Sequence, residues 1–142
     1  MKTLKQLLDD KGRDVWTIGP DMSVYDAVKL MAEKEIGALL VVEGEKPVGM
    51  VTERDYARKV ILRGRTSQDA LVSEIMTTHV LCARPDQSVE ECMAIMTEKR
   101  VRHLPVIENK KLIGMVSIGD LVKAIIDEQQ FIIQQLEHYI TG

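Results

Sequence analysis

Apolar side chains follow a helical rhythm at two places along this chain. After Ser23, and again after Ser88, they return every three or four positions. That spacing places them on one face of a helix, which we expect to be buried. Serine is a favourable N-cap, and an acidic residue follows each one three positions later, as in a capping box. The apolar positions are Val24, Ala27, Val28 and Met31 in one helix and Val89, Cys92, Met93 and Met96 in the other.

Short, unbroken apolar runs predict strands between and around these helices. The runs lie at 15–18, 38–42 and 48–52, and again at 80–83, 104–107 and 112–117. Polar turns at 43–46 and 108–111 separate the last two runs of each set and predict two hairpins. Continuous apolar runs are typical of strands that are covered on both faces. With second helices expected near 54–62 and 119–128, the pattern predicts the order β-α-β-β-α twice.

The two sets of elements are copies of one unit. Residues 15–60 align with 80–125 without a gap, so that Gly114 lies 65 positions after Gly49, and roughly a third of the pairs are identical. A unit that cannot bury its own apolar face needs a partner unit. We therefore predict an α/β fold in which two repeats pack as a pseudo-twofold pair. Such a pair would place a cleft between its halves and repeat the chemistry of that cleft.

The predicted organisation has five parts. They are an N-terminal segment (1–14), the first repeat (15–62), a linker (63–79), the second repeat (80–126) and a C-terminal helix extension (127–142). Within the linker, 73–76 predicts a short turn or helix that opens the second repeat, with 4–8 as its counterpart. A helix over 119–140 would be about 33 Å long. We expect its apolar residues to meet a second subunit, which makes a homodimer, or else to fold back.

Composition narrows the functional classes. A chain of 142 residues, 45% of them hydrophobic, is long enough for one domain or two half-domains that share a core. Its net charge of −3 argues against a general nucleic-acid binder, which would carry a basic face. No signal peptide or apolar run of about 18 residues occurs, which favours a cytoplasmic protein without a membrane span. Cys82 and Cys92 align with Thr17 and Ala27, so we expect both to be buried apolar residues.

Catalytic and metal-binding patterns do not accompany the repeats. The three histidines, at 79, 103 and 138, do not have the spacing of common metal-binding motifs. The glycine-rich patterns that bind phosphate and the nucleophile motif of hydrolases do not occur either. We therefore expect no catalytic residues, no metal site and no enzyme activity.

One motif repeats in register and combines several polar groups. Each copy has a glycine, the end of a strand, a hydroxyl residue and an aspartate three positions later at the start of a helix. The residues are Gly49, Thr52 and Asp55 in the first copy and Gly114, Ser117 and Asp120 in the second. One interpretation is an N-cap with an acid in the first helical turn. The other is a ligand site, because helix N-termini bind phosphate and a carboxylate accepts ribose hydroxyls.

These motifs resemble the CBS domain, the family named after cystathionine β-synthase. The shared pattern is Pro-Asp-x-Ser-Val, an apolar strand, and then Gly-x-Val-[Thr/Ser]-x-x-Asp; both repeats fit it. Two such copies are similar to a CBS pair, or Bateman module. The resemblance implies a pseudo-twofold pair that binds adenosine compounds in the clefts between its repeats. It implies AMP first, with ADP, ATP, NAD or S-adenosylmethionine as further ligands, and regulation of an unidentified protein.

The resemblance also implies roles for particular residues. Asp55 and Asp120 match the acid that binds ribose, Thr52 and Ser117 match the hydroxyl that contacts ribose or phosphate, and Arg54 suits a phosphate. The second repeat has Gly119 in place of that arginine, so the two sites should differ. The remaining implied site residues line the adenine or approach the phosphates. They are Trp16, Thr17, Ile18, Ile36, Gly37, Ala38, Leu81, Ala83, Val101, Arg102 and His103.

The predicted symmetry assigns residues of both repeats to each cleft. One cleft would combine Asp120, Ser117, Arg102 and His103 with Ile18, Ile36 and Ala38, and the other would combine Asp55, Thr52, Arg54 and Gly37 with Ala83, Val101 and His103. We expect Lys11 and Arg13 to be solvated charges, with a phosphate contact as the alternative. Two functions follow: a sensor of adenosine ligands, or a dimerisation and recruitment scaffold that senses nothing.

Overall fold

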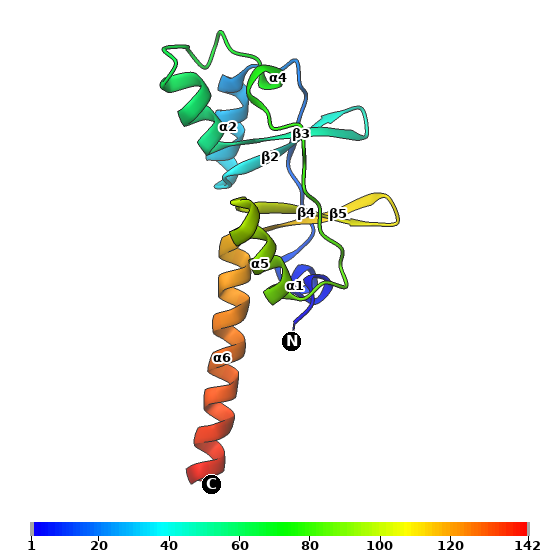
Figure 1. Ribbon diagram of the computed structural model, residues 1–142, viewed down its shortest axis with the longest axis vertical. Helices are drawn as coiled ribbons and strands as arrows, with labels where there is room; N and C mark the ends of the chain where they lie inside the picture. The colour runs from blue at the N-terminus through cyan, green and yellow to red at the C-terminus, as the bar shows by residue number, and fades with distance from the viewer. Residues whose placement is uncertain (1, 142) are drawn as a thin grey trace. The chain divides into compact units, whose positions relative to one another are not determined.

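The computed structural model describes residues 2–141 and divides the chain into two compact units (Figure 1). We call Val15–Val80 the first-repeat unit. The second-repeat unit joins the segment that ends at Asp14 to the chain from Leu81 onward. Residues 1 and 142, the ends of the predicted N-terminal segment and C-terminal extension, lie outside the described residues.

The first-repeat unit is a three-stranded sheet with helical segments. Strand β2 is central, parallel to β1 and antiparallel to β3. Its elements are β1 (Thr17–Ile18), α2 (Val24–Lys34), β2 (Ala38–Glu43), β3 (Lys46–Thr52), α3 (Glu53–Tyr56), the π-helical turn η1 (Ala57–Ile61) and α4 (Val72–Ile75). The helix predicted at 54–62 is thus an α-helical turn followed by a π-helical one. Its core includes buried Val24, Ala27 and Met31, the helical face that the spacing predicted.

The second-repeat unit has the same plan with a shorter first strand. It contains α1 (Leu4–Lys11), α5 (Val89–Lys99), β4 (His103–Glu108), β5 (Lys111–Ser117) and α6 (Ile118–Thr141). The strand predicted near Leu81–Ala83 is reduced to one parallel bridge, between Ala83 and Val106. That bridge has the register of Ile18 and Val41 in β1 and β2, since both residues lie 65 positions later. The predicted α/β fold of two repeats with a long C-terminal helix is confirmed.

The cysteines differ in their surroundings. Cys92 is buried in the core of the second-repeat unit, as predicted, whereas Cys82 is exposed. The prediction that both are buried was therefore wrong for Cys82. The reduced first strand explains the difference, since Cys82 precedes the single bridge at Ala83 and lies outside regular structure.

Each short helix that precedes one repeat packs into the unit of the other repeat. Helix α1 precedes the first repeat, but Leu4, Leu7 and Leu8 lie in the core of the second-repeat unit. Helix α4 precedes the second repeat, but Val72 and Ile75 lie in the core of the first-repeat unit. Backbone hydrogen bonds fix both exchanges, from Leu4 N–H to the Gln87 carbonyl at 2.9 Å and from Val72 N–H to the Met22 carbonyl at 2.9 Å. Position in the chain alone did not indicate this exchange.

The glycine of the repeated motif makes both exchanges sterically feasible. A Cβ atom at Gly114 would lie 2.7 Å from a methyl group of Leu8 in α1. A Cβ atom at Gly49 would lie 2.8 Å from the sulfur of Met76 and 2.9 Å from the Thr77 carbonyl oxygen. Real side chains do not approach this closely, so each glycine leaves the space in which the exchanged segment packs against the strand.

We predict that Gly49→Ala lowers the free energy of unfolding by about 1–3 kcal/mol, the usual cost of overpacking. The added methyl group displaces a backbone carbonyl that accepts a hydrogen bond from Met50 N–H at 2.9 Å. Urea denaturation followed by circular dichroism measures the effect. Gly19→Ala is the matched control, because its new methyl group would meet only Met22 at an ordinary 3.7 Å. Equal stability of the two variants would contradict the steric explanation.

Candidate functional site

Asp55 and Asp120 each take part in the N-terminal capping of a helix. The Asp55 N–H donates to Thr52 Oγ1 at 3.2 Å, and the Thr52 N–H donates back to Asp55 Oδ2 at 3.0 Å. In the second repeat, the Asp120 N–H donates to Ser117 Oγ at 3.1 Å, and the Ser117 N–H donates to Asp120 Oδ2 at 2.8 Å. The N-cap interpretation of the repeated motif is therefore confirmed in both copies.

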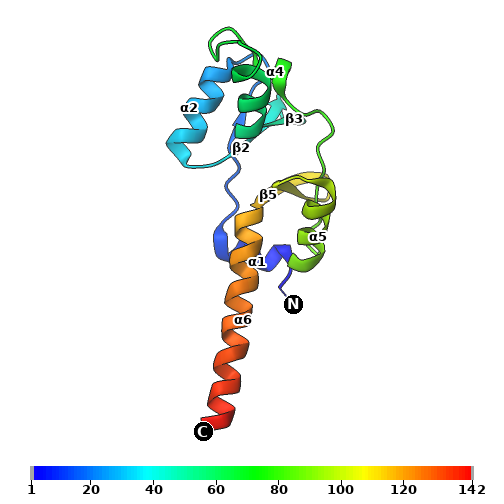
Figure 2. The same cartoon turned by 60° about the vertical axis from the view of Figure 1, so that its left-hand side comes forward.

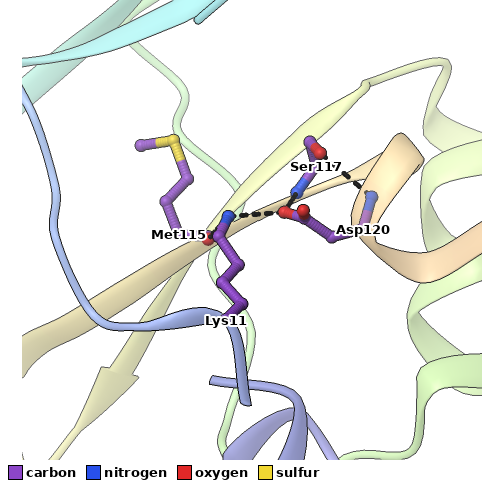
Figure 3. Close-up of polar contacts among 4 residues, drawn as sticks. All are labelled: Lys11, Met115, Ser117 and Asp120. Atoms are coloured by element: carbon purple, nitrogen blue, oxygen red, sulfur yellow. Dashed lines mark hydrogen bonds and ion pairs between the residues drawn. The ribbon is translucent and has the colours of Figure 1, made fainter. Parts of the chain in front are cut away.

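Each carboxylate also holds a lysine, and the two lysines come from different elements. Lys59, one helical turn after Asp55, lies 3.2 Å from its Oδ1 and donates to the Ile75 carbonyl at 2.8 Å. Lys11 reaches Asp120 from α1, with its Nζ 2.5 Å from Oδ2, and donates to the Met115 carbonyl at 2.8 Å (Figure 3). Each lysine thus ties the acid to a neighbouring backbone segment.

The expectation that Lys11 is a solvated charge was wrong. Its side chain bonds both Asp120 and the Met115 carbonyl, because α1 packs beside β5 (Figure 3). Arg13 instead pairs with Asp9 at 2.8 Å, an exposed interaction one helical turn apart. Sequence spacing offered a signal for Lys59, four positions after Asp55, but none for Lys11, which lies 109 positions before Asp120.

The lysine sets the ionisation of Asp120. Burial alone raises the pKa of this carboxyl, but hydrogen bonds from Lys11 and from the Ser117 backbone, with the lysine charge, outweigh burial and lower it. Asp120 is therefore an anion near neutral pH, the form in which a carboxylate accepts hydrogen bonds.

His103 lies close enough to this ion pair to respond to it electrostatically. Burial first, and then the positive charges of Lys11 and Arg102, lower the pKa of His103, while Asp120 acts in the opposite direction. The imidazole is consequently neutral near pH 7. His103 pairs with Ser117 across β4 and β5, so the histidine and the capping motif share one end of the hairpin.

Two backbone hydrogen bonds join the remaining predicted residues to the helix starts. The Glu53 N–H donates to the Gly37 carbonyl at 3.1 Å, and the Ile118 N–H donates to the Arg102 carbonyl at 2.9 Å. Ala38 pairs with Thr52 as His103 pairs with Ser117. The predicted residues of each repeat therefore gather at one end of their own hairpin. They are Ile36, Gly37, Ala38, Thr52, Arg54 and Asp55 in the first-repeat unit and Val101, Arg102, His103, Ser117 and Asp120 in the second.

The predicted first-strand residues use much of their backbone within the fold. The Trp16 carbonyl accepts from Leu40 N–H at 3.2 Å, while Thr17 and Ile18 pair with β2. The Ala83 N–H donates to the Pro105 carbonyl at 2.8 Å, so this donor is not available to an adenine ring. The partly exposed Leu81 lies outside regular structure.

A cation–π contact at Trp16 has no signal in the spacing of the sequence. The Lys34 ammonium lies 4.2 Å from the centre of the indole ring. Contacts of this kind contribute about 0.5–1 kcal/mol at exposed sites. The contact joins the last turn of α2 to the segment before β1, two elements that the hydrophobic pattern identified separately.

Two arginines at these hairpin ends remain available. Within residues 2–141, neither the half-buried Arg54 nor the exposed Arg102 makes a side-chain hydrogen bond or ion pair. A guanidinium group binds phosphate oxygens in a planar, two-pronged manner. Over the same residues, no cluster of three His, Cys, Asp or Glu side chains is suited to a metal ion, and no helix is long and apolar enough to span a membrane.

We predict that acidification destabilises the fold in two steps. Because the folded pKa of His103 is lowered, its contribution is present above about pH 6.5 and lost as pH falls below that value. The contribution of Asp120 is present above about pH 4 and lost as pH falls through its lowered folded pKa. Urea midpoints between pH 7.5 and 5.5 should fall less for His103→Gln than for the unchanged protein. The exposed His79→Gln is the control, and an identical fall in His103→Gln would contradict the assignment.

The family model of the CBS domain matches the chain twice, over residues 10–62 and 72–127. The mitochondrial CBS domain-containing protein CBSX3 of Arabidopsis thaliana is 42% identical over 150 residues, which cover 99% of this chain and 72% of that protein. A solved structure of a protein with CBS domains from Burkholderia ambifaria is 56% identical, with a TM-score of 0.87, and the match covers 90% of this chain and 96% of that one.

A more distant structure shows the same fold with ligands. The CBS domain pair of protein MJ0100, in complex with 5′-methylthioadenosine and S-adenosyl-L-methionine, is 23% identical, with a TM-score of 0.79. The match covers 90% of this chain and 98% of that one. The two family matches coincide with the two β-α-β-β-α repeats described above, and they include both capping motifs. The chain belongs to the CBS domain family and carries its domain twice, as a tandem pair.

Proposed function

We propose that this chain is a sensor that binds an adenosine-containing ligand through the hairpin ends of its two repeats. The observation that carries the proposal is the repeated pair of a capping hydroxyl and an aspartate, with an uncommitted arginine near each pair, Arg54 in the first repeat and Arg102 in the second. Carboxylates accept ribose hydroxyls, while guanidinium groups and helix N-termini bind phosphate. In this proposal the residues of one repeat complete the site of the other, as the predicted symmetry requires.

The two aspartates differ in their capacity to accept a ribose. Asp55 uses both carboxylate oxygens, since Oδ2 accepts from Thr52 and Oδ1 pairs with Lys59, and its side chain is only 12% exposed. Asp120 uses Oδ2 for both Ser117 and Lys11, and its side chain is 26% exposed. Among residues 2–141, none donates to Oδ1 of Asp120. We infer that the site of Asp120 binds its ligand more readily.

Phosphate binding would draw on different residues in the two sites. Arg54 has no counterpart in the second repeat, where Gly119 takes its position. Arg102, His103 and Lys11 instead supply positive or protonatable groups around Asp120. A phosphate beside His103 would favour its protonation and reverse the effect of the two nearby cations.

AMP is the first ligand to test, followed by ADP, ATP, NAD and S-adenosylmethionine. The CBS pair of MJ0100 binds 5′-methylthioadenosine and S-adenosylmethionine. At 23% identity, its similarity to this chain shows that the two share a fold and says nothing about the ligand of this chain. Those compounds define a chemical class, adenosine with a variable 5′ substituent. Asp55 and Asp120 recognise the shared ribose in this proposal, while the arginines and His103 would distinguish the 5′ groups.

The sensor would regulate another protein rather than catalyse a reaction. A ligand regulates only when it binds two conformations with different affinity. We propose an unidentified protein as the regulated partner, a cytoplasmic location and self-association of the chain into a homodimer. The alternative function is a scaffold without ligand sensing. The completed capping boxes favour it, because both aspartates already have structural roles without a ligand.

We predict that at least one of AMP, ADP, ATP, NAD and S-adenosylmethionine raises the thermal midpoint. A ligand at a hundred times its dissociation constant stabilises the folded state by about 2.7 kcal/mol. Differential scanning fluorimetry with each compound at millimolar concentration measures the shift, and GMP tests for selectivity toward adenine. No shift with any adenosine compound would leave the scaffold as the function.

We predict that Asp120→Asn weakens binding of the stabilising ligand by about 1–3 kcal/mol, the scale of a hydrogen bond to a charged group. Asp55→Asn should have a smaller effect, because both of its oxygens already serve the fold. Isothermal titration calorimetry measures each affinity. Asp86→Asn is the control for charge, since Asp86 is an exposed acid paired with Arg84. Unchanged affinity in both Asp120→Asn and Asp55→Asn would limit these acids to capping their helices.

A further inference from the structure

Helix α6 extends beyond the unit to which it belongs. Its first turns pack against α5, and Leu121 and Ala124 are buried in the core. Beyond them, α6 continues past α5 and α1 as one uninterrupted helix (Figures 1 and 2). Every side chain from Phe131 to Ile140 is exposed. The predicted alternative of a tail that folds back was wrong, since α6 has no break before Thr141.

The apolar side chains of α6 form a row with a period of seven. Groups at positions 122, 125 and 126 are followed by groups at 129, 132 and 133 and at 136, 139 and 140. A seven-residue period keeps one face directed at a neighbouring helix along its whole length. We call the part of this row that is symmetric about Gln129 the α6 seam; Tyr139 is left out because its mirror position is Gly119. The seam residues are Ile118, Val122, Ile125, Ile126, Gln129, Ile132, Ile133, Leu136 and Ile140. Ile118 is 36% exposed and Ile140 81% exposed, whereas Ile125 is half-buried against the core of its own unit.

The α6 seam is symmetric about Gln129. Ile118 and Ile140 lie eleven positions before and after it, and Val122 and Leu136 lie seven positions before and after it. Ile126 and Ile132 lie three positions before and after Gln129, and Ile125 and Ile133 lie four positions before and after it. When such a row meets an antiparallel copy of itself, every apolar residue faces another apolar residue and Gln129 faces Gln129. Each amide can then donate one hydrogen bond to the carbonyl oxygen of the other.

The charges beside the seam favour the antiparallel direction. At about 100° per residue, Lys123 and Glu137 fall on the same edge of the apolar face, within about 40° of each other. In an antiparallel pair related by a twofold axis, equal edges meet, so Lys123 of each copy approaches Glu137 of the other. A parallel pair brings opposite edges together and loses both of these ion pairs. Asp127 lies on the far side of the helix from the seam.

We propose that the α6 seam is the docking site for the α6 helix of a second copy of this chain, running antiparallel with Gln129 at the twofold axis. The proposal rests on the self-association proposed above and specifies its surface, direction and register. The paired length, from Ile118 to Ile140, is about 33 Å. The pairing covers the apolar side chains that the structure otherwise leaves exposed, which are all of the row's isoleucine, leucine and valine residues except the half-buried Ile125.

Cysteine cross-linking tests direction and register. In a Cys82→Ser background, Val122→Cys and Leu136→Cys chains are mixed, refolded together and oxidised. Cys92 does not interfere, since burial and Glu91 raise its pKa to about 11. We expect the mixture to form a covalent heterodimer and each variant alone to remain uncross-linked. A covalent homodimer of Val122→Cys alone would show a parallel pair and overturn the proposed direction.

A charge reversal tests the two edge contacts. Glu137→Lys should weaken dimerisation about tenfold, because it sets two lysines against each other in both of the contacts along that edge. Adding Lys123→Glu to that variant should restore the affinity. Asp127→Lys makes the same change in charge away from the seam and serves as the control. Equal weakening by Asp127→Lys and Glu137→Lys, measured by analytical ultracentrifugation, would overturn the edge pairing.

The oligomeric state separates failure of this inference from failure of self-association. Light scattering of the full chain should give the mass of a dimer, and truncation after Ile126 should give a monomer. A full chain that is monomeric at all concentrations would overturn self-association itself. A dimer that persists after the truncation, or after Ile133→Asp, would keep self-association and overturn the α6 seam as its site. Pull-down of a different protein by α6 from a monomeric chain would also overturn the proposal.

Discussion

Each unit depends on the close packing of a chain segment against a glycine in the last strand of its hairpin: helix α1 in the second-repeat unit, and the residues that follow α4 in the first. At Gly114 the missing side chain admits Leu8, and at Gly49 it admits Met76 and the Thr77 backbone. This packing brings α1 into the second-repeat unit and holds α4 in the first. The exchange has a chemical consequence, because α1 delivers Lys11 to Asp120. Gly114 therefore influences Asp120 indirectly, because the space it leaves lets α1 pack where Lys11 can pair with that carboxylate.

The same motif consequently produces two electrostatic environments. In the first-repeat unit the aspartate takes its lysine from the following helical turn, and both of its oxygens are engaged. In the second-repeat unit the lysine comes from α1, and His103 and Arg102 contribute to the same local potential. Two copies of one hydroxyl–carboxylate pair thus differ in charge, exposure and hydrogen bonding. A ligand that binds ribose and phosphate would meet two unequal partners.

Much of the fold followed from periodicity, because periodicity reflects local geometry. The helices after Ser23 and Ser88, both hairpins and the long C-terminal helix depend on side-chain spacing and capping within a few residues. The predictions that were wrong all concern tertiary contacts. The strand near Ala83 is a single bridge, Cys82 is exposed and Lys11 is paired. Each depends on segments far apart in the chain, which spacing does not relate. The roles proposed for the arginines and for the hairpin ends remain predictions.

The sequence by itself determined the repeat, the order of its elements, the capping pairs at Thr52 and Ser117, and the apolar row along α6. These features depend on neighbours within one or two helical turns, or on the comparison of one repeat with the other. Tertiary structure alone decided which unit each opening helix joins and that Lys11 meets Asp120. Those choices depend on steric fit between segments that are distant in the chain. Gly114 and Leu8, whose close packing positions Lys11 beside Asp120, illustrate that dependence.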